Sequence, residues 1–256
     1  MTTEYTGGGD PKRSMELLWG VQDRPRRGPK PKLTVEAIVG TAIAIADAEG
    51  LAGLSMRRVA EHLGVTAMSL YTYVPGKAEL LDVMLDTVHG EVATADDGDA
   101  GWRTRLERLA RENWALYRRH PWLLQVATSR PVLGPHLMAK WDRELTVVEG
   151  LGLTEIEMDL LVSLLADYVH GAVRGAVEAA QAEQRTGMTD EQWWYSYAPL
   201  LEQVFDPARY PVAARVGEVT GAEYNAPSDP GRSFEFGLQR VLDGIEVFVR
   251  ARSAGA

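Results

Sequence analysis

The chain has 256 residues, of which 45% are hydrophobic and 25% are charged, close to the average for a soluble globular protein. It contains no cysteine, which excludes a disulfide framework, a thiolate zinc site and a catalytic thiol. No apolar run approaches the roughly 18 residues that span a bilayer, and the N-terminus lacks the apolar core of a signal peptide. We therefore expect a cytoplasmic protein without a membrane partner.

The formal net charge of −9 argues at first against a nucleic-acid partner. The charge is unevenly distributed, because residues 24–77 carry eight basic and four acidic side chains and so have a net charge of +4. Residues 1–23 carry −2 and residues 78–256 carry −11. An acidic body with one basic end orients a protein towards DNA and limits indiscriminate binding elsewhere.

Residues 1–33 are expected to form a flexible, basic N-terminal extension. Prolines and a glycine interrupt its basic stretch, residues 24–32, and keep that stretch out of a helix. Its basic side chains are Arg24, Arg26, Arg27, Lys30 and Lys32. One hypothesis is an arm that enters the minor groove of DNA, with Arg26 and Arg27 in contact, and the alternative is a solvated leader. Residues 1–23 indicate no role by themselves.

Hydrophobic residues recur with the period of an α-helix through most of the chain, which predicts an all-α fold. The first helix is expected from Thr34, its N-cap, to Glu49, with Gly50 ending it. Further helices are predicted over 55–63, 66–73 and 77–92. The polar stretch 95–101 marks a domain boundary, so we expect one domain over 34–94 and a second over 101–256.

The two short helices between Ser55 and Tyr73 have the organisation of a helix-turn-helix. In such a unit the first helix crosses the second and fixes its angle, and the second lies in the major groove. The tyrosines and Lys77 suit phosphate contacts, whereas Arg57, Ser69 and Thr72 suit base edges. An ordinary helical hairpin with surface tyrosines is the alternative. The residues expected to contact DNA here are Ser55, Met56, Arg57, Thr66, Ala67, Met68, Ser69, Tyr71, Thr72, Tyr73 and Lys77.

Longer helices are predicted in the second domain, over 102–119, 135–150, 154–184 and 233–250. Thr154 with Glu157, and Thr189 with Gln192, have the spacing of capping boxes, so an aromatic-rich helix also begins at 189. Residues 206–232 contain four prolines and are expected to be a long irregular connection.

The segment 34–92 resembles the DNA-binding domain of the TetR (tetracycline-repressor-like) family. The long helix with Gly171, Gly175 and Ala176, and the last helix with Phe236 to Leu238 and Gly244, are similar to the tetracycline-repressor branch. The resemblance implies an N-terminal three-helix helix-turn-helix DNA-binding domain followed by a larger helical ligand-binding and dimerisation domain. It also implies a homodimer that reads a palindromic operator and leaves it when a small molecule binds. The residues that carry the N-terminal resemblance are Ile43 to Gly50, Leu54 to Ala60, Leu63 to Val65, Leu70, Tyr71, Tyr73, Val74, Lys77, Leu80 and Leu81.

Aromatic side chains concentrate in the second domain and indicate a small hydrophobic or aromatic effector. Such sites are apolar with a few convergent polar groups and lie between the helices of a bundle. The alternative for each aromatic is plain core packing. The residues expected to contact the effector are Trp114, Tyr117, Trp122, Trp141, Tyr168, His170, Trp193, Trp194 and Tyr197.

Neither a metal nor another cofactor is expected. In tetracycline repressors a histidine and a glutamate help to hold the magnesium ion of the drug. The resemblance places Ala127 and Gly175 at those positions, and neither side chain can coordinate a hard cation. The five histidines show no metal-binding spacing, so a structural role is expected for them.

Small residues along the helices over 154–184 and 233–250 allow close backbone approach. The two helices from each subunit are expected to form a four-helix dimer interface, and packing of the same faces within one chain is the alternative.

The leading hypothesis is therefore a ligand-responsive repressor. An enzyme is not expected, because the sequence shows no nucleophile elbow, phosphate-binding loop or recognisable pair of carboxylates. The alternative from another class is a helical small-molecule-binding protein without specific DNA binding.

Overall fold

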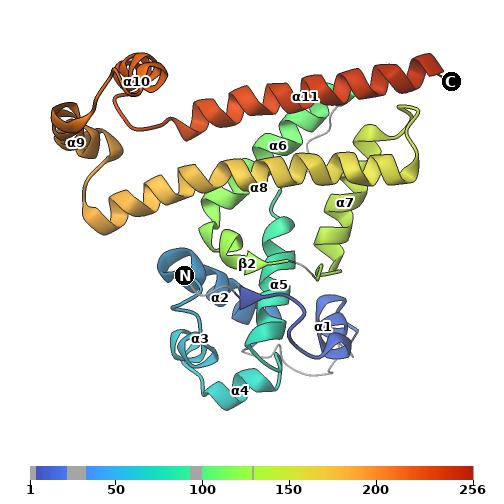
Figure 1. Cartoon of the computed structure of the whole chain (residues 1–256). Coiled ribbons are helices and arrows are strands. Elements are labelled where there is room, and N and C mark those ends of the chain that lie inside the picture. The colour runs from blue at the N-terminus through green and yellow to red at the C-terminus, as the bar shows by residue number, and fades with distance from the viewer. Residues whose placement is uncertain (1–3, 22–32, 93–99, 129, 256) are drawn as a thin grey trace.

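The computed structural model describes residues 4–21, 33–92, 100–128 and 130–255, and within them the chain forms eleven α-helices, one 3-10 helix and two strands of two residues each. The expected all-α class is confirmed. The helices form a smaller N-terminal unit below a larger one, whose longest helices, α8 and α11, run side by side (Figure 1).

The N-terminal unit is built from α2 (Val35–Glu49), α3 (Met56–Leu63), α4 (Ala67–Tyr71) and α5 (Lys77–His89). The side chain of Thr34 caps α2 and that of Ser55 caps α3, each by accepting a backbone N–H three residues later. Gly64 ends α3 with φ of +67°, a left-handed conformation that glycine adopts without strain. The inward faces of these helices share one core, which includes Ile38, Val59, Leu70 and Leu80.

Residues 4–21 are folded, so the expected flexible extension is wrong for this part of 1–33. Strand β1 (Glu4–Tyr5) pairs in parallel with β2, and α1 (Pro11–Leu18) lies against α5. Asp10 caps α1 by accepting the backbone N–H of Lys12 and Arg13. The basic stretch with Arg26 and Arg27 lies outside the described residues.

The C-terminal unit begins with α6 (Trp102–Arg119), the 3-10 helix η1 (Pro121–Gln125), β2 (Val126–Ala127) and α7 (Pro135–Val148). It continues with α8 (Glu155–Thr186), α9 (Asp190–Val204), α10 (Pro211–Tyr224) and α11 (Pro230–Gly255). Helices α6, α7, α8 and α11 enclose a second core, which includes Leu106, Leu165 and Leu238. Both expected capping boxes are present, at Thr154 and at Thr189.

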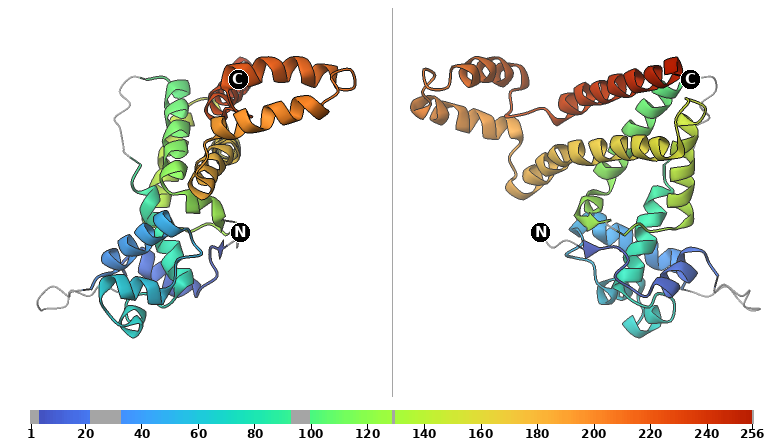
Figure 2. Two further views of the ribbon diagram at one scale, coloured as in Figure 1. Left: turned by 90° about the vertical axis from the view of Figure 1, so that its left-hand side faces the viewer. Right: turned by 45° about the vertical axis from the view of Figure 1, so that its right-hand side comes forward.

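Residues 206–232 are not one irregular connection, because they contain α10 over fourteen residues. Two of the four prolines lie at helix starts: Pro211 opens α10 and Pro230 opens α11. Proline is tolerated in the first turn, where its missing N–H has no helical partner. Helices α9 and α10 form a hairpin that projects beyond the rest of the unit, and neither has a buried residue (Figure 2).

The expectation that no apolar segment is long enough to cross a membrane is also corrected. Among the described helices, α8 passes that criterion by length and composition, over Glu155–Thr186. One side of this helix, with Leu161, Leu165 and Val169, is buried in the second core against α6 and α11. The sequence concealed this because charged residues separate its apolar runs.

Candidate DNA-reading surface and effector cavity

Helices α3 and α4 meet through Gly64 and Val65, as a helix-turn-helix requires. Apolar side chains of both helices enter the core of the N-terminal unit, with Val59 and Leu70 fully buried. This packing sets the angle between the helices and leaves one face of α4 to solvent. The unit lies at the end of the molecule farthest from α8 and α11 (Figure 1).

Several residues expected to contact DNA lie on this exposed face. Met68 is 74% exposed and Tyr71 is 46% exposed. The hydroxyls of Thr66 and Ser69 lie 2.9 Å apart, so they share a hydrogen bond at the start of α4. Arg57 is exposed on α3, where its Nε donates to Glu61 Oε1 at 2.9 Å. Thr72 is also exposed. Side chains that suit base edges and phosphates therefore share one surface.

Other members of the expected set have structural positions. Met56 is 7% exposed and belongs to the core, because the helical period turns it inward beside Val59. Ala67 and Tyr73 are partly buried against the same core. Ser55 uses its hydroxyl as the cap of α3. The Nζ of Lys77 donates to Glu4 Oε1 at 2.8 Å.

A cavity of about 230 Å³ lies where the two units meet. Helix α5 contributes Leu85 and His89 from the N-terminal unit. The remaining walls of the cavity come from α6, η1, β2, α7, α8 and the segment between β2 and α7. The residues of these other walls are Tyr117, Leu123, Val126, Thr128, Pro131, Val132, Leu137 and His170.

The polar groups of the cavity favour a neutral ligand with hydroxyl or carbonyl groups. Burial lowers the pKa of His89 to about 4, outweighing the bond that its Nδ1 donates to the Leu85 carbonyl at 2.8 Å. With Nδ1 protonated, Nε2 of the neutral ring is an acceptor. Burial raises the pKa of Tyr117 to about 12 and lowers the pKa of His170. All three side chains are therefore uncharged near neutral pH.

The cavity unites two of the nine residues expected to bind an effector, Tyr117 and His170, whose rings meet edge to face at 5.6 Å. Trp114 and Tyr168 pack instead on Phe234 of α11. Trp122 is 1% exposed and packs in the core that the N-terminal unit shares with η1.

The remaining four lie away from the cavity wall. Trp141 is 44% exposed on α7. Trp193, Trp194 and Tyr197 lie outside both cores, because α9 belongs to the projecting hairpin. The Trp193 and Tyr197 rings stack on each other there at 4.5 Å.

Most of the cavity wall escaped the sequence analysis. Leu85 was not expected at a ligand site, and His89 was expected to be structural. Their spacing of four places them on the same face of α5, which was a usable signal. Val126, Thr128 and Val132 follow η1 in a segment without periodicity, so no pattern indicated them. Among the described residues, no group of three or more histidines and carboxylates is arranged to hold a metal ion.

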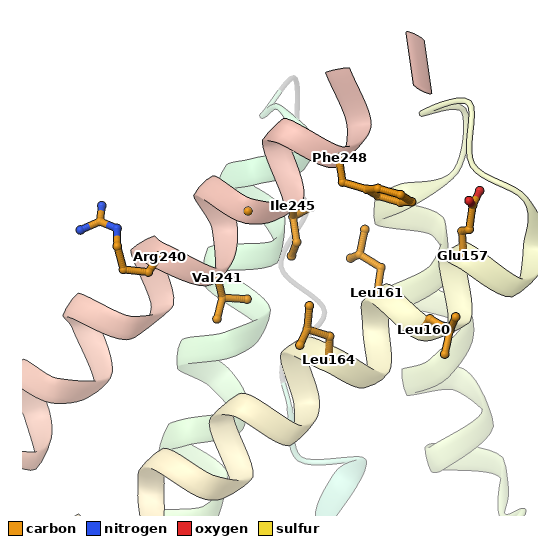
Figure 3. Close-up of a pocket in the computed structure, with 9 residues that line it drawn as sticks. Glu157, Leu160, Leu161, Leu164, Arg240, Val241, Ile245 and Phe248 are labelled. Carbon is orange, nitrogen blue, oxygen red and sulfur yellow. The ribbon is translucent and has the colours of Figure 1, made fainter. Parts of the chain in front are cut away.

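A second hollow is a groove between α8 and α11 on the outer face of the C-terminal unit. Leu160, Leu164 and Phe248 line it together with Val241 and Ile245, and Glu157 and Arg240 lie at its ends (Figure 3). Ile156, Leu160 and Leu164 are 73%, 61% and 52% exposed, at a spacing of four on α8. The chain thus presents an apolar stripe that nothing in the described residues covers.

Models of two protein families match the chain. Residues 38–84 match the family described as bacterial regulatory proteins, tetR family, and residues 94–249 match the tetracyclin repressor-like C-terminal domain. The repressor DrrR1 of Streptomyces coeruleorubidus, an HTH-type transcriptional repressor, is 51% identical over 253 residues, which cover 98% of this chain and 91% of that protein. The class C tetracycline repressor protein of Escherichia coli is 28% identical over 84% of this chain and 91% of its own length.

Solved structures with the same architecture include ActR from Streptomyces coelicolor. Apo ActR has a TM-score of 0.67 and 26% identity, covering 89% of this chain and all of that one. ActR in complex with actinorhodin has a TM-score of 0.67 and 27% identity, covering 87% of this chain and 99% of that one.

Proposed function

Since the chain belongs to the TetR family of bacterial transcriptional regulators, we propose that it represses transcription as a homodimer on a palindromic operator and is released by a small hydrophobic or aromatic molecule. The observation that carries the proposal is the course of α5. This helix begins beside α4 and ends with Leu85 and His89 in the wall of the cavity. One rigid element therefore joins the surface that reads DNA to the site that binds the effector.

The DNA-reading role is supported by the exposed face of α4. Arg57, Ser69 and Thr72 supply donors and acceptors for base edges, and Tyr71 supplies a hydroxyl for the backbone. The basic stretch 24–32 remains a candidate for an arm in the minor groove or for non-specific phosphate contacts.

The effector role is supported by the cavity and by the ActR complex. Its apolar wall and three uncharged polar side chains suit a flat molecule that carries hydroxyl or carbonyl groups. A ligand of this kind would press Leu85 and His89 on one side and Leu137 on the other. A displacement of α5 or α7 would change the distance between the two reading heads of a dimer, which must match successive major grooves about 34–36 Å apart.

Dimerisation is supported by the apolar groove between α8 and α11. The exposed stripe of Ile156, Leu160 and Leu164 continues towards Gly171, where an added Cβ would meet nothing within 4 Å. Gly244 is equally open. Gly237, by contrast, is needed within the chain, because a Cβ there would lie 2.4 Å from the Tyr168 hydroxyl. The groove, which includes Gly244, and the open position at Gly171 suit a partner copy of the same two helices.

We infer further that the protein acts by binding and not by turnover, in the cytoplasm, where the chromosome lies. The test of DNA binding is a protection footprint on the DNA that flanks its own gene, at low salt. Protection of a two-fold-symmetric sequence supports the proposal. Absence of protection, with ligand binding intact, would favour the small-molecule-binding protein without specific DNA binding.

The test of the cavity is a thermal-shift screen of natural products and drugs, with actinorhodin as the first compound. A ligand at 100 times its Kd stabilises the folded state by about 2.7 kcal/mol, which is roughly 5–10 °C for a chain of this size. Thr128→Trp places a large ring at the mouth of the cavity and should abolish the shift. Val212→Trp, on exposed α10, is the matched control and should retain it.

A further inference from the structure

Residues 4–21 lie outside both family-model matches, yet they contact the two functional parts of the molecule. We call this segment, β1 with α1, the N-terminal clasp. Leu17 and Leu18 of α1 pack on the core of the N-terminal unit. On the other side, Trp19 donates its indole N–H to the Leu133 carbonyl at 2.9 Å. The clasp therefore bridges α5 and the segment that precedes α7.

Two carboxylates of α5 accept hydrogen bonds from the clasp. Asp82 is 3% exposed and accepts the Gly7 N–H at 3.2 Å and the Ser14 hydroxyl at 3.0 Å. Glu79 accepts the Asp10 N–H at 3.0 Å. The backbone approaches Glu79 closely at Gly9, because a Cβ there would lie 2.3 Å from Glu79 Oε1 and would force this side chain to move. Two of the three buried carboxylates of α5, Glu79 and Asp82, thus use the clasp for their hydrogen bonds.

The upper side of the clasp is bonded to the wall of the cavity. In the parallel pair, Glu4 lies opposite Val126 and Tyr5 opposite Ala127. The Thr6 hydroxyl, which is buried, hydrogen-bonds to the carbonyls of Ala127 and Arg130. Val126 and Thr128 line the cavity from the same stretch of chain. A displacement of this wall would therefore move β1 directly, through these hydrogen bonds.

Glu4, on β1, forms an ion pair with Lys77, and this pair connects the clasp to the start of α5. Lys77 is the first residue of α5, the helix that follows α4, and its ammonium group lies 2.8 Å from the Glu4 carboxylate. Both side chains are about one-third exposed, so solvent only partly screens the pair. A phosphate of the operator would have to displace Glu4 to use Lys77.

We propose that Glu4 is a positioning residue that competes with the DNA backbone for Lys77, and that the clasp ties this competition to the cavity. The inference rests on the proposed function. DNA binding releases Lys77 from Glu4 and loosens β1 from β2. A ligand that stiffens the wall at 126–132 holds β1 in place and returns Lys77 to Glu4. Because linkage is reciprocal, ligand and operator then weaken each other.

The test compares Glu4→Gln with Glu16→Gln, which removes the same charge from the same segment. Operator affinity is measured by fluorescence anisotropy between 50 and 200 mM salt on the footprinted DNA. Glu4→Gln should bind about threefold to tenfold more tightly, with a steeper salt dependence by about one ion per freed phosphate contact. Glu16→Gln should stay within about twofold of the wild type. In a Lys77→Gln background, Glu4→Gln should have no effect beyond that of Glu16→Gln.

The link to the cavity wall is tested by Thr6→Val, which keeps the volume of the side chain and removes its two hydrogen bonds. It should tighten operator binding in the same direction as Glu4→Gln, and the two together should be less than additive. Urea melts check that each variant folds.

An unchanged operator affinity in Thr6→Val would overturn the link to the wall. If Glu4→Gln behaves like Glu16→Gln while the wild type protects its palindrome, the inference fails and the proposed function stands. If neither the wild type nor any variant binds DNA, the inference and the proposed function both fail.

Discussion

The imidazole of His120 lies between Asp47 of α2 and Glu91, which follows α5. Its Nδ1 is 2.7 Å from Asp47 Oδ1 and its Nε2 is 3.1 Å from Glu91 Oε2. The indole of Trp122 donates to the same Asp47 oxygen at 2.8 Å. His120 is 3% exposed. This cluster joins the C-terminal end of α6 to two helices of the DNA-binding unit, so it is a second connection between the units beside α5.

Replacing His120 by alanine should lower the free energy of unfolding by about 1–3 kcal/mol, because two carboxylates then lose a buried partner. The measurement is a urea melt at pH 7. His62→Ala is the control, since His62 is exposed on α3 and its loss should change the free energy by under about 0.5 kcal/mol. Equal melts for the two variants would show that the cluster does not hold the units together.

The free energy of unfolding should decrease as the pH is lowered through the range set by the pKa of His89. Its pKa is about 4 in the folded chain, below the ordinary value of 6.5, because burial disfavours the charged ring. Between these values the unfolded chain binds more protons, so this stabilisation is complete above pH 6.5 and is lost as the pH falls towards 4. The loss amounts to about 3 kcal/mol.

His89→Gln removes the titration and should flatten the stability profile, measured by urea melts from pH 7.5 to 4.5. His136→Gln makes the same change at an exposed position and should leave the profile as in the wild type. A profile of His89→Gln that parallels the wild type would mean that His89 does not set this dependence.

Residues on the reading surface should separate into two classes. Arg57→Ala and Ser69→Ala should relax base preference at individual operator positions by about 1–3 kcal/mol. Tyr71→Phe should weaken binding to all sequences by about threefold to tenfold, since a backbone hydrogen bond carries no sequence information. Competition binding against single-base operator variants makes the distinction. The assignment fails if Arg57→Ala weakens every sequence equally.

Leu160→Glu should dissociate the dimer, because it places a charge in the middle of the apolar stripe on α8. Sedimentation velocity should show a shift of the main species from dimer to monomer. Val21→Glu adds the same charge at a position 71% exposed on the other unit and should remain dimeric. A dimer that survives Leu160→Glu would place the interface elsewhere.

The sequence predicted most of the fold because the helices of both units have strong periodicity and recognisable caps. Thr34, Ser55, Thr154 and Thr189 each cap the helix that was expected to follow. It missed α10, where Pro207 and Pro211 suggested a connection although proline also opens helices. It missed the folded clasp, since α1 depends on contacts with Asp82, 68 residues away.

The candidate site was harder to predict than the fold. The spacing of residues on a surface helix such as α4 indicates which of them face outward. On α3 the same spacing turns Met56 inward, and this was overlooked. The residues that line the cavity depend on which helices pack together, and amino-acid composition does not indicate this packing. Trp193 and His170 look equally suitable in the sequence, yet one lies on an exposed hairpin and the other in the cavity wall.

If one cavity controls operator binding, a compound that fills it must release the DNA, and an anisotropy titration of the complex on the footprinted palindrome measures this release. The titrants are compounds that raise the melting temperature of the wild type and of Val212→Trp but not of Thr128→Trp. These compounds should release the DNA from the wild type and leave the Thr128→Trp complex intact. Compounds that occupy the cavity while the wild-type complex stays bound would show that the cavity does not control operator binding.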